Sequence, residues 1–242
     1  MNGIAIHKRL LALLCVAVMC MAMVLTGCGQ GASSSSSDAS SASSAADSGE
    51  TATSKKAQAD GPYASGTHHA TLTVEGYDPI TMELDADAAP ASVANFCALA
   101  EEGYYDGLTF YRFADGFCMQ GGTKGNTSSG NDAALDPVVG EFSQNGYDNE
   151  LADHFQKGTV AMARSSDPNS ATSTFFVTLD SNQTVSMSLN GQYAAFGTID
   201  EAGMKIVDKI VEDYLPNVTE PGMGMIDDEA KQAKITSIKI VD

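Results

Sequence analysis

Basic residues are scarce in this chain. Its 242 residues include 13 lysines and arginines against 31 aspartates and glutamates, so the formal net charge is −18 with histidine neutral. Proteins that bind nucleic acid depend on cationic contacts with phosphate. The composition therefore argues against a nucleic-acid partner, although net charge says nothing about the fold.

The sequence also lacks an apolar run long enough for a comfortable membrane span. The apolar run at residues 10–25 follows the basic pair Lys8 and Arg9 and precedes small residues up to Cys28. This order of basic, apolar and small residues is typical of a secretory signal. We therefore expect residues 1–27 to be a signal peptide, with an uncleaved anchor as the alternative.

The residues from Leu25 to Cys28 read LTGC and resemble the lipobox of bacterial lipoproteins. This resemblance implies cleavage before Cys28, acylation of its thiol, and an extracytoplasmic protein anchored by lipid to the bacterial cell membrane. Several acyl chains on one residue would hold the protein firmly, whereas one chain binds only marginally. The alternative is an ordinary signal peptide with an incidental cysteine.

Residues 28–65 lack apolar periodicity and are rich in serine, alanine and glycine. Such a segment cannot bury enough apolar surface to offset its chain entropy, so we expect a disordered tether. From Gly66 to Asp242 the composition turns globular, over a length that suits one domain with its own core. We find no internal repeat and no second linker there.

Cysteine is scarce as well. Of the five cysteines, Cys15 and Cys20 would leave with the signal and Cys28 would be acylated, which leaves Cys97 and Cys118. An exported protein could join this pair in a disulfide, but sequence alone does not give their separation. As a free thiol, Cys118 would be inert in an apolar setting, because burial raises a thiol pKa.

The sequence of the domain predicts about eight short strands and two helices, and the two helices lie far apart along the chain. Residues 67–74 and 79–84 form a predicted hairpin. One helix begins at Pro90 and ends at Gly103, and a second, amphipathic helix covers residues 201–215. This pattern favours a closed barrel or a sandwich over a parallel sheet.

Arg112 lies in the strand-like segment TFYRF, among aromatic side chains. Alternation predicts that Phe110 and Arg112 share one face and that Tyr111 and Phe113 share the other. Because arginine keeps its charge, it must find acceptors or stay partly wet. Two readings stay open: a surface arginine paired with a carboxylate or a backbone carbonyl, or a donor for a ligand's carbonyl or amide.

Other patterns that carry chemistry are incomplete. His68 and His69 are adjacent on a predicted strand and point to opposite faces, which makes a poor metal site. The loop around Lys124 lacks the G-x-x-x-x-G-K-[ST] order of a phosphate cradle, and no nucleophile-elbow motif accompanies His154. These absences count against a phosphate site and a hydrolase triad.

Three segments of the sequence resemble, in the same order, the motifs of bacterial cyclophilins, which are peptidyl-prolyl cis-trans isomerases. The segments are GYYDGLTFYRFADGFCMQGG, GTVAMARSSDPNSATSTFFVTL and LNGQYAAFGTI. The resemblance runs from about His69 to the C-terminus. It implies a mainly β fold, a closed eight-stranded antiparallel barrel capped by two α-helices, with an active groove on its outer face.

The resemblance also implies roles for individual residues. Arg112 would be the catalytic arginine, with Phe117 and Gln120 in the same motif. The substrate-binding positions would be Cys118, Ala163, Arg164, Thr174, Phe176, Leu189 and Tyr193. We expect a monomer with no cofactor or metal that acts on proline-containing, incompletely folded polypeptides of exported proteins.

The chemistry explains why such residues belong together. Rotation about an X-Pro bond meets a barrier of roughly 18 to 20 kcal/mol because of amide resonance. A catalyst must hold the twisted amide better than the planar one. A guanidinium could donate to the prolyl nitrogen once twisting frees its lone pair, and apolar walls that exclude water would strengthen the donation.

Three positions depart from the family pattern. Cys118 replaces a methionine, Thr174 replaces a substrate-binding glutamine, and Ser188 stands where a large aromatic is common. Each change trims the groove. The alternative function is therefore a catalytically weak, proline-peptide-binding chaperone on the same fold. A solute-binding lipoprotein would need two α/β lobes, which a strand-rich domain does not supply.

Overall fold

A computed structural model of the chain describes residues 55–127 and 132–242. The predicted signal peptide, Cys28 and most of the predicted tether lie outside these residues. In the part that is described, every helix is too short or too polar to pass through a bilayer.

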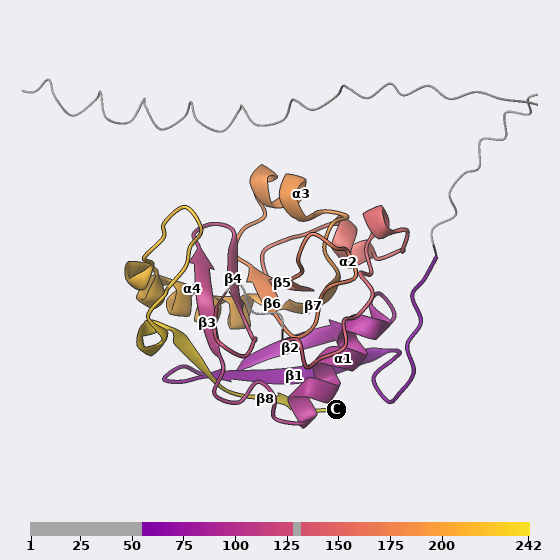
Figure 1. The fold of residues 1–242 in the computed structure, drawn as a ribbon, viewed down its shortest axis with the longest axis horizontal. Coiled ribbons are helices and arrows are strands. Elements are labelled where there is room, and N and C mark those ends of the chain that lie inside the picture. Colours follow the sequence, from indigo (N-terminus) through magenta and orange to yellow (C-terminus); the bar gives the residue numbers. More distant parts are fainter. Residues whose placement is uncertain (1–54, 128–131) are drawn as a thin grey trace, which may run out of the picture. The chain divides into compact units, whose positions relative to one another are not determined.

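The described strands close into one antiparallel barrel (Figure 1), in which neighbours follow the order β1-β2-β7-β5-β6-β4-β3-β8 and β8 pairs back onto β1. This confirms the predicted fold. The sequence pattern does not predict β4 as a strand. The strand bounds are β1 (Thr67–Val74), β2 (Ile80–Asp85), β3 (Thr109–Ala114), β4 (Cys118–Gly121), β5 (Thr159–Met162), β6 (Phe175–Thr178), β7 (Ala195–Ile199) and β8 (Ala233–Ile240).

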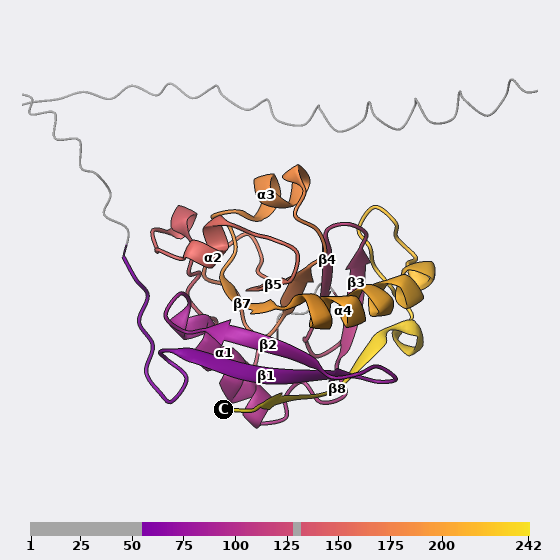
Figure 2. The same cartoon turned by 180° about the vertical axis from the view of Figure 1, so that it is seen from behind.

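Two longer helices pack on the barrel, as expected. The first, α1 (Pro90–Glu101), contacts β8, β2 and β7, and α4 (Glu201–Tyr214) contacts β2. Figure 2 shows α4 in front of the barrel strands. Two shorter helices, α2 (Glu150–Asp153) and α3 (Gln183–Leu189), were not predicted. Because α3 carries Ser188 and Leu189, it also helps to form the groove described below.

Alternation along the hairpin fills the barrel. Leu72 of β1 pairs with Ile80 of β2, and Ala70 pairs with Met82, and all four side chains are fully buried. This confirms the predicted hairpin and its inward face. Phenylalanines complete the packing, with Phe175 edge-on to both Phe96 and Phe110. The interior is therefore a packed core, and any binding site must lie outside it.

The start of α1 depends on a residue far away in the sequence. Its N-cap, Ala89, provides no side-chain hydrogen bond. Instead the fully buried Glu141 accepts hydrogen bonds from the backbone N–H groups of Ala91 and Ser92, both at 2.8 Å, and from the Ser92 hydroxyl at 2.6 Å. Burial raises the pKa of Glu141, and these hydrogen bonds act against that rise. The carboxylate also suits the positive end of the helix dipole.

The predicted alternation in β3 is wrong. The pairing of β3 with β4 shifts register between Phe110 and Arg112, as expected of a β-bulge. The extra residue puts both Phe110 and Phe113 into the core cluster, while Arg112 stays half-buried. A regular strand could not bury both rings and still present the arginine two residues after the first.

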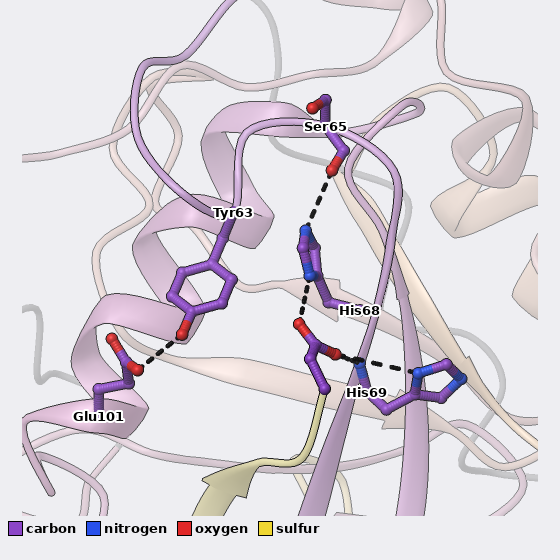
Figure 3. A network of polar contacts seen from close by, with 6 residues as sticks. Tyr63, Ser65, His68, His69 and Glu101 are labelled. Atoms are coloured by element: carbon purple, nitrogen blue, oxygen red, sulfur yellow. Dashed lines mark hydrogen bonds and ion pairs between the residues drawn. The ribbon is translucent and has the colours of Figure 1, made fainter.

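Residues 63–68 are held against the barrel by a polar network (Figure 3). His68 Nδ1 lies 2.5 Å from Asp242 Oδ2, and His68 Nε2 lies 3.1 Å from the Ser65 carbonyl oxygen. The Tyr63 hydroxyl donates to Glu101 of α1 at 2.6 Å. This network, which we call the terminal latch, connects three segments that are distant in sequence.

Contacts with the folded domain begin before the predicted domain boundary at residue 66. Lys55 forms an isolated bridge with Tyr147, in which its N–H donates to the Gly146 carbonyl and its carbonyl accepts from the Asp148 N–H. Residues 55–65, which the sequence assigns to the tether, therefore contact the folded domain at both ends, through the loop at residues 146–148 and through α1.

Candidate active site

Three residues predicted for the site form a row across neighbouring strands. Arg112 of β3 is paired with Gln120 of β4, and Gln120 is paired with Phe176 of β6. Residues directly opposite one another in antiparallel strands point to the same face of a sheet. The register of β3, β4 and β6 therefore brings these side chains together on one face.

The row opens into a groove of about 200 Å³. All of the predicted catalytic and substrate-binding residues line it except Thr174, and Ser188 joins them. Its lining comprises Arg112, Phe117, Cys118, Gln120, Ala163, Arg164, Phe176, Ser188, Leu189 and Tyr193. Strands, loops and α3 contribute residues, so distant motifs meet at one place.

Arg112 uses two of its three guanidinium nitrogens in hydrogen bonds to described residues. Its Nε donates to the Met223 carbonyl oxygen at 2.8 Å and its Nη1 donates to Gln120 Oε1 at 3.0 Å, while Nη2 makes no hydrogen bond to a described residue. The guanidinium carbon lies 5.8 Å from the centre of the Phe117 ring. A backbone carbonyl thus accepts a hydrogen bond from Arg112, as expected if this residue were a surface arginine. Unused N–H groups of Arg112 nevertheless remain at the groove, as expected of a donor for a ligand.

Gln120 connects Arg112 to a buried tyrosine. Its Nε2 donates to the Tyr111 hydroxyl at 3.0 Å while its Oε1 accepts from Arg112. Tyr111 is 1% exposed, and burial raises its pKa. Because both ends of the amide are bound, the orientation of Gln120 is defined. The sequence reading did not assign Tyr111 to the site, because the bulge that positions it is not visible in a hydrophobic pattern.

The floor of the groove is apolar. Phe176 and Leu189 are almost completely buried. The Tyr193 ring stands edge-on to Phe176, with ring centres 5.7 Å apart, and Phe155 stacks against Phe176 from another side. Packing on several sides fixes the Phe176 ring, so the floor is rigid and contains no polar atom from these rings except the Tyr193 hydroxyl.

Arg164 forms a second cationic wall. Its Nε donates to the Gln192 carbonyl at 2.9 Å and its Nη1 donates to the Ser165 carbonyl at 2.8 Å. The guanidinium carbon lies 4.7 Å from the centre of the Tyr193 ring and 5.3 Å from that of Phe142. Contacts of this kind between a cation and an aromatic ring are attractive.

The positions that depart from the family pattern differ in their surroundings. Thr174 is buried, and its hydroxyl oxygen makes no hydrogen bond within the described part of the chain. Ser188 is exposed at the edge of the groove. The open question of a disulfide is answered, because Cys97 and Cys118 are both free and buried. Burial raises the pKa of Cys118 to about 11, although nearby Arg112 acts in the opposite direction.

A second hollow in the described part of the chain has no arginine in its lining. This wider hollow, of about 600 Å³, lies between Lys56, Asp87 and His154 and shares no residue with the groove. Within residues 55–127 and 132–242, no three histidine, cysteine, aspartate or glutamate side chains gather closely enough to hold a metal ion. Arginine donors beside an apolar floor therefore distinguish the groove.

Comparison with known proteins agrees with this geometry. The family model described as cyclophilin type peptidyl-prolyl cis-trans isomerase matches residues 69–240, which include the whole groove. The chain belongs to the cyclophilin family. The relatives and the solved structure described below are peptidyl-prolyl cis-trans isomerases, and this cyclophilin is one as well.

Two bacterial relatives show the extent of the likeness. Peptidyl-prolyl cis-trans isomerase A of Dickeya dadantii is 36% identical over 159 residues, which are 64% of this cyclophilin and 77% of the relative. The isomerase of Acinetobacter baylyi is 37% identical over 163 residues, 66% and 79% of the two chains.

A solved structure shows the same fold. The Cryptosporidium parvum cyclophilin type isomerase, crystallised in the presence of the dipeptide Ala-Pro, superposes with a TM-score of 0.57 at 25% identity. The match covers 72% of this cyclophilin and 99% of the solved chain.

Proposed function

We propose that this cyclophilin rotates X-Pro bonds in incompletely folded exported proteins, with Arg112 as its catalytic donor and a lipid on Cys28 as its anchor. The observation that carries the proposal is the groove itself, in which a guanidinium with unused donors lies beside the buried rings of an apolar floor. The Ala-Pro dipeptide named for the solved relative supports a proline-containing substrate.

The reaction needs a hydrogen-bond donor and an apolar surface that excludes water, rather than a nucleophile. As the amide twists, the prolyl nitrogen loses its conjugation with the carbonyl and gains a lone pair that can accept a hydrogen bond. Arg112 donates to this nitrogen, and the donation is stronger in the twisted state than in the planar one, which is the condition for catalysis. Gln120 supports Arg112 through its Oε1 and thereby limits the reorganisation that the donor needs.

The remaining side chains hold the substrate. Phe176, Leu189 and Phe117 surround the pyrrolidine ring and exclude water from the bond that rotates. Ala163 and Tyr193 line the rest of the groove and contact the peptide on either side of proline. These contacts serve both amide isomers, so they contribute binding more than rate.

Arg112→Ala tests the catalytic role. We expect kcat/KM for a proline peptide, measured by NMR exchange, to fall on the order of a hundredfold, as when one transition-state donor is removed. Arg112→Lys keeps the charge but not the planar geometry, and we expect it to recover only part of the loss. Equal rates for wild type and Arg112→Ala, with thermal unfolding unchanged, would reject the mechanism.

A second candidate, a peptide-binding chaperone with feeble turnover, is favoured by Thr174 and Ser188. The short Thr174 side chain is not part of the groove lining. The small, exposed Ser188 side chain makes the groove shallower on the side that α3 forms. If peptides bind to wild type but exchange no faster than in free solution, and Arg112→Ala changes only affinity, this second function applies.

The proposed anchor has its own test. The sequence LTGC at residues 25–28 supports acylation of Cys28. We expect Cys28→Ser to move the protein from the membrane fraction to the soluble extracytoplasmic fraction and to abolish incorporation of labelled palmitate. Wild type that takes up no label yet stays in the membrane fraction would refute the lipid anchor and leave the uncleaved signal as its replacement.

A further inference from the structure

The arginines of this chain are distributed unusually. The sequence contains three, Arg9, Arg112 and Arg164, and both that lie within the described residues line the groove. Every ion pair that we find among those residues has lysine or histidine as its cation. Although the chain has 31 acidic residues, the two guanidinium groups at the groove have no carboxylate partner among the described residues.

Arg164 is positioned but not neutralised. Two backbone carbonyls and two aromatic rings hold its plane, as described above, and these partners carry no formal charge. Its Nη2 makes no hydrogen bond to a described residue, and Nη1 uses one of its two N–H groups. A half-buried guanidinium with such unused donors matches a carboxylate, which can accept two parallel hydrogen bonds.

A merely structural role would explain only part of this arrangement. The carbonyls of Ser165 and Gln192 could be bound by any donor, and the rings could pack against an aliphatic chain. The charge strengthens those contacts, but none of these partners carries the negative charge that would neutralise Arg164, which lies in the wall of the groove close to the proposed proline floor of Phe176 and Leu189. A substrate that provides a carboxylate would supply that charge.

We propose that Arg164 forms a subsite for the side-chain carboxylate of an aspartate or glutamate next to proline, so that this cyclophilin prefers acidic X-Pro or Pro-X segments. The inference rests on the proposed function and specifies its substrate class. Arg164 is then a specificity-determining residue, whereas Arg112 acts on the rotating bond of every substrate.

The net charge of the molecule makes this preference local. A formal charge of −18 repels acidic peptides at long range, whereas the Arg164 subsite attracts them at contact. At about 0.15 M salt the Debye length is about 8 Å, so repulsion from distant carboxylates is largely screened while a half-buried contact pair is screened less. Measurements at this ionic strength therefore report the subsite.

Two peptide series test the proposal. One places glutamate, glutamine or lysine before proline, the other places them after it, and kcat/KM is measured by NMR exchange. In at least one series we expect wild type to prefer glutamate over glutamine by about fivefold to tenfold, as for a partly exposed, charge-assisted contact. In Arg164→Gln the ratio of glutamate to glutamine should fall to about one, whatever the variant does to all peptides in common.

Control variants separate this subsite from general charge effects. Lys205→Gln removes the same charge from the exposed face of α4, where Lys205 pairs with Glu201, and it should keep the wild-type ratio. Arg164→Lys should keep part of it, and it replaces Arg164→Gln if that variant fails to fold. A wild-type ratio near one in both series, or a ratio that survives in Arg164→Gln, would overturn the proposal.

Failure of the proposed function gives a different result. If wild type accelerates no peptide at all, isomerisation is refuted, and the subsite is then tested by dissociation constants for the same peptides from NMR titration. Tighter binding of glutamate peptides that depends on Arg164 supports the subsite in that case. Equal binding of the three peptides contradicts it.

Discussion

Glu141 and Arg112 are both ionisable residues that are at least half-buried, but their hydrogen-bond partners differ. The Glu141 carboxylate is fully buried, and its oxygens accept three hydrogen bonds from the first turn of α1. Arg112 is half-buried, uses its Nε and Nη1, and retains unused donors in a groove. A charge whose partners are all internal serves the fold, and a charge with donors to spare is available to a ligand.

Among the variants that test this comparison, we expect Glu141→Ala to have the largest effect on stability. The substitution leaves two backbone N–H groups and a hydroxyl buried without partners, so we expect the free energy of unfolding to fall by about 3 kcal/mol. Urea denaturation measures the loss. Activity per folded molecule should stay near wild type, because Glu141 does not line the groove.

Glu141→Gln is the matched control for that prediction. The amide oxygen can still accept a hydrogen bond from an α1 N–H group, but the amide NH₂ faces the remaining donors. The free energy of unfolding should therefore fall less in Glu141→Gln than in Glu141→Ala. If Glu141→Ala unfolded at the wild-type urea concentration, the carboxylate would not be the anchor of α1.

Tyr111→Phe sharpens the comparison at an intermediate scale. It removes the acceptor for Gln120 Nε2, so Gln120 and through it Arg112 become less well oriented. One neutral hydrogen bond contributes about 1 kcal/mol, and we expect kcat to fall by roughly threefold to tenfold with KM nearly unchanged. A drop in stability with no change in kcat would show that Tyr111 serves only the fold.

Asp242→Asn in the terminal latch should have the smallest effect. Hydrogen bonds from His68 and from the His69 N–H lower the pKa of Asp242. A carboxyl group with a lowered folded-state pKa stabilises the protein above its unfolded-state pKa, and this contribution is lost as pH falls through the folded-state value. The side chain is 37% exposed, so solvent screening limits the contribution to less than about 1 kcal/mol.

The measurement is the difference in unfolding free energy between wild type and Asp242→Asn as a function of pH. We expect a difference at neutral pH that shrinks below about pH 4, where carboxyl groups of the unfolded chain take up protons. A difference that grew on acidification would contradict the assigned sign.

The sequence predicted the barrel because its hairpin alternation and its two long helices follow simple periods. The resemblance also named, motif by motif, residues such as Arg112 and Phe176 that line the groove, while the catalytic and binding roles that it assigned stay predictions. It did not predict the hydrogen bond from Arg112 to Met223 or the anchor at Glu141, because each joins segments far apart in the chain without any local pattern. The polar helix α3 escaped notice because it is short, with few buried residues.

The irregularity in β3 sets a rule for changes in chain length. Deleting Tyr111 would remove only the extra residue and would leave Arg112 opposite Gln120. A one-residue change that the bulge does not absorb would instead turn Arg112 toward the space that the Phe110 and Phe113 rings occupy. Desolvating a guanidinium there would cost far more than losing one aromatic side chain. Single-residue deletions and insertions elsewhere in β3 should therefore be selected against in this protein, while loops at the barrel ends tolerate them.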